Sequence, residues 1–198
     1  MNLLFFDTET TNLPDWRSPS DAPHQPHLIQ IAAILCDDSG DVKDEWQTLV
    51  QPGAGAVMGE QAFAAHGISL DRAAADGLSI PDTWARFNEL VSGAEGVVGH
   101  NVTFDLRIMR IFGARATGKK WQSPIPHRCT MRMADKIMQL PPTEKMIAAG
   151  FTKSKPPNLT ECIRFFFDEQ LEGAHDALAD VRACKRVYFA IKERVASE

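Results

Sequence analysis

The distribution of apolar residues at the beginning of the chain predicts a β-meander. Apolar runs lie within residues 3–7, 28–38 and 45–52, and turn-rich segments separate them. The sequence Asp-Asp-Ser-Gly-Asp at 37–41 suits a hairpin between the second and third runs. We therefore expect three strands joined in antiparallel order.

Beyond residue 52 most apolar positions follow helical spacing. Helices are predicted over residues 60–67, 80–94, 102–118, 160–168 and 175–196. Short buried strands are predicted over residues 97–101 and 125–133. Pro81 lies in the first turn of the second predicted helix, and Asn101 is placed to cap the third. A meander followed by alternating helices and strands is typical of an α/β fold with a mixed sheet.

Two proline-rich segments interrupt this pattern. Residues 14–27 and residues 140–158 each contain four prolines. Proline lacks a backbone donor and restricts the residue before it, so repeated prolines disfavour both helices and strands. We expect both segments to be irregular loops.

Size and composition indicate a single soluble domain over residues 1–198. The chain is 44% hydrophobic and 24% charged, which is ordinary for a globular protein. No apolar run approaches the roughly 18 to 20 residues that a membrane helix needs. An acidic pair that begins at residue 7 leaves no room for a signal peptide, so we expect a cytoplasmic location. The four cysteines are widely spaced and are expected to be reduced and mostly packed inside.

The net charge of −5 conceals an uneven distribution of charge. Residues 1–105 carry 4 basic and 16 acidic side chains, whereas residues 106–167 carry 12 basic and 3 acidic ones, a net charge of +9. A segment this basic is suited to face an anion, although solvated helix faces produce the same composition.

Two carboxylates stand at the end of the first predicted strand. Residues i and i+2 of a strand point to the same face, so Asp7 and Glu9 project side by side while Thr8 turns away. Two adjacent like charges are unfavourable unless one carboxylate keeps its proton or a cation lies between them. Carboxylate oxygens select magnesium or manganese, which makes a metal site one hypothesis for this pair. The pair alone is a weak signal, because an Asp-x-Glu sequence is common at the end of a strand.

Further acids and a histidine follow in two helical segments. Asp105 falls in the first turn of the helix predicted over 102–118, where the helix dipole favours negative charge with or without a metal. His175 and Asp180 are five residues apart, about 140° around a helix, so they cannot share a helical face. If Asp180 points towards a metal, His175 must lie at the helix entrance, on looser backbone. A surface or capping role is the alternative for His175.

Three motifs together resemble the DEDDh, or DnaQ-like, family of 3′-to-5′ exonucleases, which includes the proofreading subunits of bacterial replicases. The resemblance covers nearly the whole chain. The motifs are Phe-Asp-Thr-Glu-Thr-Thr-Asn-Leu at 6–13, Gly-His-Asn-Val-Thr-Phe-Asp at 99–105 and Ala-His-Asp-Ala-Leu-Ala-Asp-Val at 174–181. All five hallmark positions of the family are matched: Asp7, Glu9, Asp105, His175 and Asp180.

The resemblance implies a ribonuclease H-like fold, with a mixed five-stranded sheet flanked by helices. It also implies hydrolysis of terminal phosphodiester bonds to nucleoside 5′-monophosphates with two Mg²⁺ or Mn²⁺ ions. Asp7 would bridge both ions, Glu9 and Asp180 would complete one coordination shell, and Asp105 would reach the other ion mainly through water. His175 would act as the general base. The expected substrate is single-stranded DNA or an unpaired 3′ end.

Four further residues are expected to contact the 3′-terminal nucleotide because of the same resemblance. Thr10 and its neighbours would offer backbone contacts to the 3′ hydroxyl. Leu13 would wedge beneath the terminal base, and His66 would border the same nucleotide. The alternatives are that Leu13 simply packs in the core and that His66 only stabilises a turn. Phe104 lies close to the substrate in this family, although core packing is the simpler role for it.

The sequence departs from the family pattern at three places. Asn12 stands where the family often has glycine, and asparagine tolerates positive φ better than most residues. Arg128 and Cys129 stand where relatives commonly carry aspartate before threonine. The segment at 14–27 is longer than usual, which affects the expected shape of the substrate site at that edge.

Several competing hypotheses remain open at this stage. The nearest is an RNA-directed 3′-to-5′ exonuclease of the same fold, which the 2′ hydroxyl would distinguish. Another is a non-catalytic domain that binds nucleic acid or a polymerase, and a third is a metal-free hydrolase built on Cys129 and a histidine. Only 18 residues follow Asp180, which favours a stand-alone enzyme over one with a long polymerase-binding tail. A polymerase partner and the oligomeric state are left open.

Overall fold

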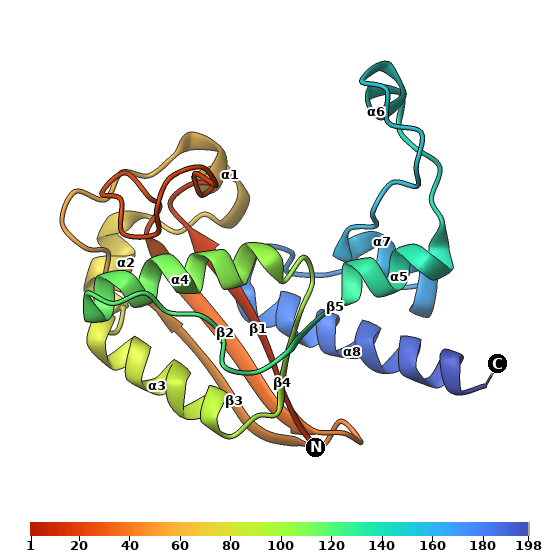
Figure 1. The fold of residues 1–198 in the computed structure, drawn as a ribbon, viewed down its shortest axis with the longest axis horizontal. Helices are drawn as coiled ribbons and strands as arrows, with labels where there is room; N and C mark the ends of the chain where they lie inside the picture. Colours follow the sequence, from red (N-terminus) through yellow and green to blue (C-terminus); the bar gives the residue numbers. More distant parts are fainter. Residues whose placement is uncertain (198) are drawn as a thin grey trace.

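A mixed sheet of five strands, in the order β3-β2-β1-β4-β5, forms the centre of the computed structural model, which describes residues 1–197 (Figure 1). The three antiparallel strands are β1 (Asn2–Thr10), β2 (Leu28–Asp37) and β3 (Val42–Leu49). The two strands that continue the sheet in parallel are β4 (Gly96–Gly99) and β5 (His127–Cys129). The predicted meander and the predicted α/β class are therefore confirmed.

Helices cover both faces of this sheet (Figure 1). Their bounds are α1 (Glu60–His66), α2 (Leu70–Asp76), α3 (Ile80–Ser92), α4 (Thr103–Thr117), α5 (Thr130–Met138), α6 (Glu144–Ala148), α7 (Leu159–Phe167) and α8 (Ala177–Ala196). Helices α3 and α4 lie on one face and α8 lies on the other. Within residues 1–197, no helix has both the length and the apolar character needed to cross a membrane.

Strand β1 is buried on both faces and therefore connects two parts of the core. Leu4 and Phe6 pack in the cluster formed with α3 and α4, whereas Leu3 and Phe5 pack in the cluster formed with α8. The side chains of a strand alternate between faces, so Asp7 continues the row that points towards α8. The packing of β1 thus fixes the direction of its carboxylates.

The predicted strand over residues 125–133 is wrong for its second half. Only His127 to Cys129 pair with β4, and α5 begins at Thr130. The pairing stops there because β4 itself ends at Gly99. The hydroxyl of Thr130 then lies 3.0 Å from Nδ1 of His100 and 3.3 Å from the carbonyl oxygen of Gly99, which fixes the beginning of the helix.

Asn101 does not cap α4, contrary to the prediction. It adopts a left-handed conformation with φ of 65°, and its carbonyl oxygen accepts a hydrogen bond from Phe104 N–H at 2.8 Å. The chain turns sharply between β4 and α4, and asparagine is among the residues that tolerate this backbone conformation. Asn101 therefore serves the turn itself.

The two proline-rich segments differ in structure. Residues 14–27 contain turns and no helix or strand, as predicted. Residues 140–158 project from the body of the molecule, and they include the five-residue helix α6, which the sequence did not predict (Figure 1). The hydroxyl of Thr143 caps this helix by accepting a hydrogen bond from Met146 N–H at 3.2 Å. Helix α2 was not predicted either.

Gly113 of α4 allows close contact with Trp84 of α3. A Cβ atom at position 113 would lie 2.6 Å from Cη2 of Trp84, and the indole is held by edge contacts with Phe112 and Trp121. We expect Gly113→Ala to lower the free energy of unfolding by about 1 to 3 kcal/mol, even though alanine favours helices. Denaturant titration measures this change.

A double mutant tests whether the indole causes this loss. Trp84→Phe removes the clashing ring atoms, so Gly113→Ala should be less destabilising in that background than in the parent chain. A stabilising effect of Gly113→Ala in the parent chain would contradict the proposed contact.

Candidate active site

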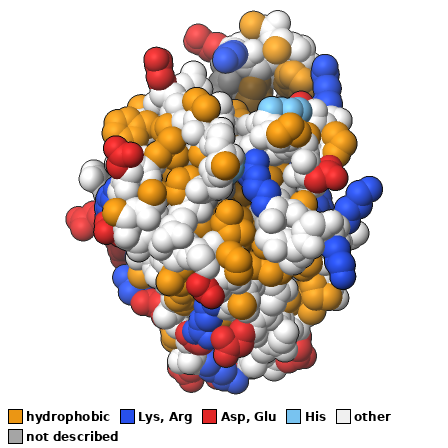
Figure 2. Space-filling model, turned by 90° about the vertical axis from the view of Figure 1, so that its left-hand side faces the viewer, with side chains coloured by type: hydrophobic (Ala, Val, Ile, Leu, Met, Phe, Trp, Pro, Cys, Tyr) orange, Lys and Arg blue, Asp and Glu red, His pale blue; other side chains and the backbone are white. Residues whose placement is uncertain are grey.

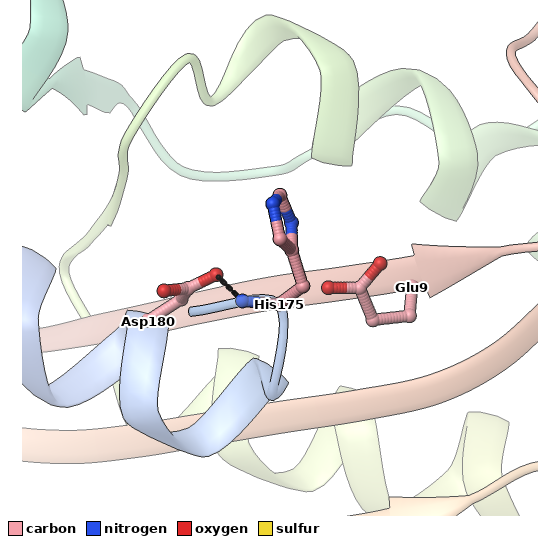
Figure 3. A group of neighbouring side chains, drawn as sticks. All are labelled: Glu9, His175 and Asp180. Atoms are coloured by element: carbon pink, nitrogen blue, oxygen red, sulfur yellow. Dashed lines mark hydrogen bonds between the residues drawn. The ribbon is translucent and has the colours of Figure 1, made fainter. Parts of the chain in front are cut away.

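Three of the predicted site residues come together at the carboxyl end of β1. Glu9 belongs to that strand, Asp180 to the first turn of α8, and His175 to the loop that precedes α8. A ring nitrogen of His175 and one carboxylate oxygen each from Glu9 and Asp180 all lie within 4.8 Å of one another. Figure 3 shows the two carboxylates on either side of His175, whose ring projects away from β1.

Asp105 approaches the same end of β1 from the other face of the sheet. Its Oδ1 accepts hydrogen bonds from the backbone N–H of Thr8 at 3.1 Å and from the Thr8 hydroxyl at 2.7 Å. Only 2% of Asp105 is exposed. Because Thr8 lies between Asp7 and Glu9, these bonds fix Asp105 beside both carboxylates.

The two oxygens of Asp180 have different surroundings. Oδ2 accepts a hydrogen bond from the backbone N–H of His175 at 3.1 Å, and His175 has a left-handed φ of 67° (Figure 3). Oδ1 is buried and has no hydrogen-bond partner among residues 1–197. A buried, unsatisfied carboxylate oxygen is unfavourable, and coordination to a cation would satisfy it.

Burial and mutual repulsion raise the pKa values of the strand carboxylates. Burial, followed by the charges of Asp105, Glu9 and Asp180, raises the pKa of Asp7 well above its usual range. Burial and the charges of Asp180 and Asp105 raise the pKa of Glu9 to about 8. Without a cation, the two groups therefore resist ionisation at neutral pH.

The helix carboxylates show the same trend. Burial raises the pKa of Asp105 to about 7, against the opposing effect of the hydrogen bonds from Thr8. Burial also raises the pKa of Asp180, although the His175 backbone N–H opposes the change. Four carboxyl groups that disfavour their own ionisation, together with one orphaned buried oxygen, fit the ligand set of a divalent cation.

Asp176 belongs to this acidic group, and the sequence analysis missed it. Its carboxylate caps α8 by accepting hydrogen bonds from the N–H groups of Leu178 and Ala179, at 3.1 and 3.2 Å. The side-chain amide of Gln47 donates to it at 3.0 Å from β3. The charge of Asp176 also raises the pKa of Glu9. Aspartate just before an apolar helical segment is a typical N-cap signal, which makes this role visible in the sequence.

Thr10 and His66 are connected by a hydrogen bond. Nδ1 of His66 accepts from Ile68 N–H at 3.0 Å, so the proton lies on Nε2, which donates to the carbonyl oxygen of Thr10 at 3.2 Å. Burial lowers the pKa of His66, in agreement with a neutral ring. His66 therefore connects the end of α1 to the end of β1. This structural role does not depend on contact with a nucleotide.

Leu13, Phe104 and Asn12 have distinct environments. Leu13 is 73% exposed, so the alternative that it packs in the core is wrong. Phe104 is partly buried against the cluster of α3 and α4, as expected for a packing role. Asn12 is not among the residues with positive φ in the described part of the chain, so its tolerance of that conformation is not used here. Its side-chain oxygen instead accepts from Leu13 N–H at 2.8 Å.

A sequence model of the protein family described as "Exonuclease" (RNase T type) matches residues 4–188 of this chain. The matched segment includes all five of the predicted catalytic residues. A comparison with curated protein sequences found no significant match.

Solved structures of exonuclease I have a similar fold. E. coli exonuclease I in complex with a dA16 oligonucleotide has a TM-score of 0.73 at 21% identity, over 98% of this chain and 41% of that chain. The zinc-bound E. coli complex with single-stranded DNA has a TM-score of 0.73 at 22% identity, over 98% of this chain and 40% of that chain. Exonuclease I from Methylocaldum szegediense has a TM-score of 0.72 at 23% identity, over 98% of this chain and 40% of that chain. The chain thus spans about two fifths of the length of these proteins. The similarity confirms the predicted ribonuclease H-like fold.

The raised pKa of Glu9 predicts how stability depends on pH in the absence of metal. The pKa rises from 4.5 to about 8 on folding, so the native state holds this proton more tightly than the unfolded state does. Glu9 therefore has no effect on stability below about pH 4, destabilises the fold increasingly as pH rises, and does so fully above about pH 8. In EDTA, Glu9→Gln should raise the melting temperature by several degrees at pH 8 and have little effect at pH 4.

Thermal melting of the two proteins across this pH range measures the effect. Glu193→Gln, an exposed position near the end of α8, is the matched control for loss of one carboxylate. A lower melting temperature for Glu9→Gln than for the parent at pH 8 would contradict the electrostatic interpretation. Addition of Mg²⁺ should stabilise the parent more than Glu9→Gln.

Proposed function

This chain belongs to the exonuclease family, and from that membership we propose that it hydrolyses nucleic acid from the 3′ end. The proposed substrate is single-stranded DNA or an unpaired DNA 3′ end, and the proposed products are nucleoside 5′-monophosphates. The observation that carries this proposal is the convergence of Glu9, Asp180 and His175 at the end of β1, with Asp7 and Asp105 beside them.

Four carboxylates would hold the divalent cations: Asp7, Glu9, Asp105 and Asp180. Bound Mg²⁺ or Mn²⁺ lowers the pKa of a water molecule and stabilises charge on the leaving oxygen. The orphaned Oδ1 of Asp180 and the raised pKa values of all four acids support this assignment. A related exonuclease I has been solved in a zinc-bound form, which supports a divalent cation in the family.

His175 is proposed to accept the proton of the attacking water. Its ring is exposed and lies within 4.8 Å of the Glu9 and Asp180 oxygens, on a residue with left-handed backbone. Imidazole exchanges protons near neutral pH, which suits it to this task. The backbone N–H of the same residue orients Asp180, so His175 would contribute through both its ring and its main chain.

The residues that surround this group suit the recognition of a terminal nucleotide. Leu13, three residues after Thr10, presents an exposed apolar side chain, and His66 of α1 donates a hydrogen bond to the Thr10 carbonyl. We propose that Leu13 packs under the terminal base and that Thr10 and His66 border its sugar. Phe104 would support this site through its packing against the cluster of α3 and α4.

Similarity to DNA complexes favours DNA over RNA as the substrate. Two of the similar E. coli structures contain dA16 and dT13 oligonucleotides. Matched DNA and RNA strands of one sequence distinguish the two substrates, since they differ at the 2′ hydroxyl. A preference for RNA would retain the proposed chemistry and correct the proposed substrate.

Asp7→Asn should abolish the nuclease activity. The substitution replaces one of the four proposed metal-binding carboxylates with a neutral amide, and we expect release of mononucleotides to fall at least about 10³-fold. A 5′-labelled single strand digested with Mg²⁺ reports both the rate and the 3′-to-5′ direction. Asp135→Asn is the matched control, because Asp135 of α5 also has a buried oxygen without a partner among residues 1–197. Equal activity of the parent and Asp7→Asn would refute the proposal.

His175→Gln separates proton transfer from binding. We expect kcat to fall about 10²- to 10⁴-fold, the usual contribution of a general base, while the affinity for Mg²⁺ and for the strand changes little. Single-turnover digestion and calorimetry measure the two effects. His24→Gln, at an exposed position in the 14–27 segment, is the control. An unchanged kcat for His175→Gln would exclude the ring from proton transfer.

A further inference from the structure

We propose that a basic groove beside α4 binds the phosphates of the substrate strand at nucleotides upstream of its 3′ end. This inference deepens the proposed exonuclease function and rests on it for the identity of the strand. The groove lies between the 14–27 segment and residues 118–122, and its volume is about 590 Å³. Its lining residues are Pro19, Ser20, Asp21, Arg107, Arg110, Ala114, Gly118, Lys119, Lys120, Trp121 and Gln122.

The groove has a large excess of positive charge. Four of its lining side chains are cationic, whereas Asp21 is its one carboxylate. Within residues 1–197, none of the four cations forms an ion pair, although ion pairs occur elsewhere on the surface. Uncompensated cations in a concave wall attract anions and concentrate them locally. Figure 2 shows one face of the molecule, on which Lys and Arg side chains lie mainly along the right-hand side and at the lower end.

Arg107 gives the groove a fixed wall. It is 9% exposed, and its guanidinium donates to the hydroxyl of Ser20 at 2.8 Å and to the carbonyls of Asp15 and Ser18 at 2.9 and 2.6 Å. Its Nε is buried without a partner in the part of the chain that the structure describes. Burial and the charge of Arg110 lower the pKa of Arg107, and the charge of Asp15 opposes this change. The 14–27 segment is therefore held rigidly over α4.

This segment connects the groove to the candidate active site. It follows Leu13, which is 73% exposed, and continues through Trp16, which is 56% exposed, to Ser20 in the groove wall. Along α4, Arg110 lies about 8 Å from Asp105 at 1.5 Å per residue. A strand with its 3′ nucleotide at Leu13 is thus within reach of the groove.

The spacing of the cations favours a strand over a single phosphate. Arg110 and Gly118 are separated by about 12 Å along the helix axis, and Lys119 and Lys120 follow directly. A row of this length can contact successive phosphates of a strand. Trp121 adds an aromatic wall and is fixed by edge contacts with Trp84 and Phe87. Basic side chains beside aromatic surfaces are a general feature of single-strand binding sites.

The test compares two triple variants in the Asp7→Asn chain, so that binding is measured without cleavage. One removes the groove cations (Arg110→Ala, Lys119→Ala, Lys120→Ala). The control removes three exposed cations elsewhere (Lys43→Ala, Arg72→Ala, Lys192→Ala) and has the same net charge. Fluorescence anisotropy with a labelled 15-nucleotide and a labelled trinucleotide DNA measures Kd at several salt concentrations.

We expect the groove variant to raise Kd for the 15-nucleotide strand at least about 10-fold and for the trinucleotide less than about twofold. The slope of log Kd against log salt should fall by about 2 relative to the control, because three phosphate contacts are lost. Equal Kd values and salt slopes for the two triple variants would overturn the groove assignment. Because the assay detects binding alone, it tests the groove even if the parent chain shows no exonuclease activity.

Discussion

Mutual repulsion among the carboxylates at the end of β1 is the constraint on which the rest of this structure depends. Asp7 and Glu9 share one face of a buried strand, and Asp105 is tied to Thr8 between them. The charge of each acid raises the pKa values of its neighbours, which shows that the acids repel one another when ionised. The packing of the surrounding elements holds them together. The packing of β1 between α4 and α8 therefore opposes an electrostatic force that a divalent cation would remove.

Local sequence patterns predicted most of the fold, and the resemblance to the exonuclease family indicated the acids of the candidate site. The position of Asp7 and Glu9 on one face follows from the two-residue period of a strand, and the location of His175 before α8 follows from the geometry of a helix. Elements whose ends depend on a partner were less predictable. The strand at 127–129 stops where β4 stops, and no local signal at Thr130 indicates that boundary.

Long-range contacts explain what the sequence could not indicate. Asp176 is recognisable as a helix cap, but its bond to Gln47 joins residues that are 129 positions apart. The groove beside α4 is a further example, since Arg107 contacts carbonyls of the 14–27 segment across about 90 residues. The basic composition of residues 106–167 suggested an anion-binding surface, but only folding selects the side chains that form one wall. Charge composition thus predicts the type of ligand more readily than its location.

Helix α8 performs two tasks that cannot be separated. Its first turn supplies Asp180, while Val181, Val187 and Tyr188 of the same helix complete the core against β1 and α7. Any fluctuation that lifts the beginning of α8 from the sheet opens the core and removes a site carboxylate at the same moment. Amide hydrogens of the first turns of α8 should therefore be protected from exchange nearly as long as those of β1.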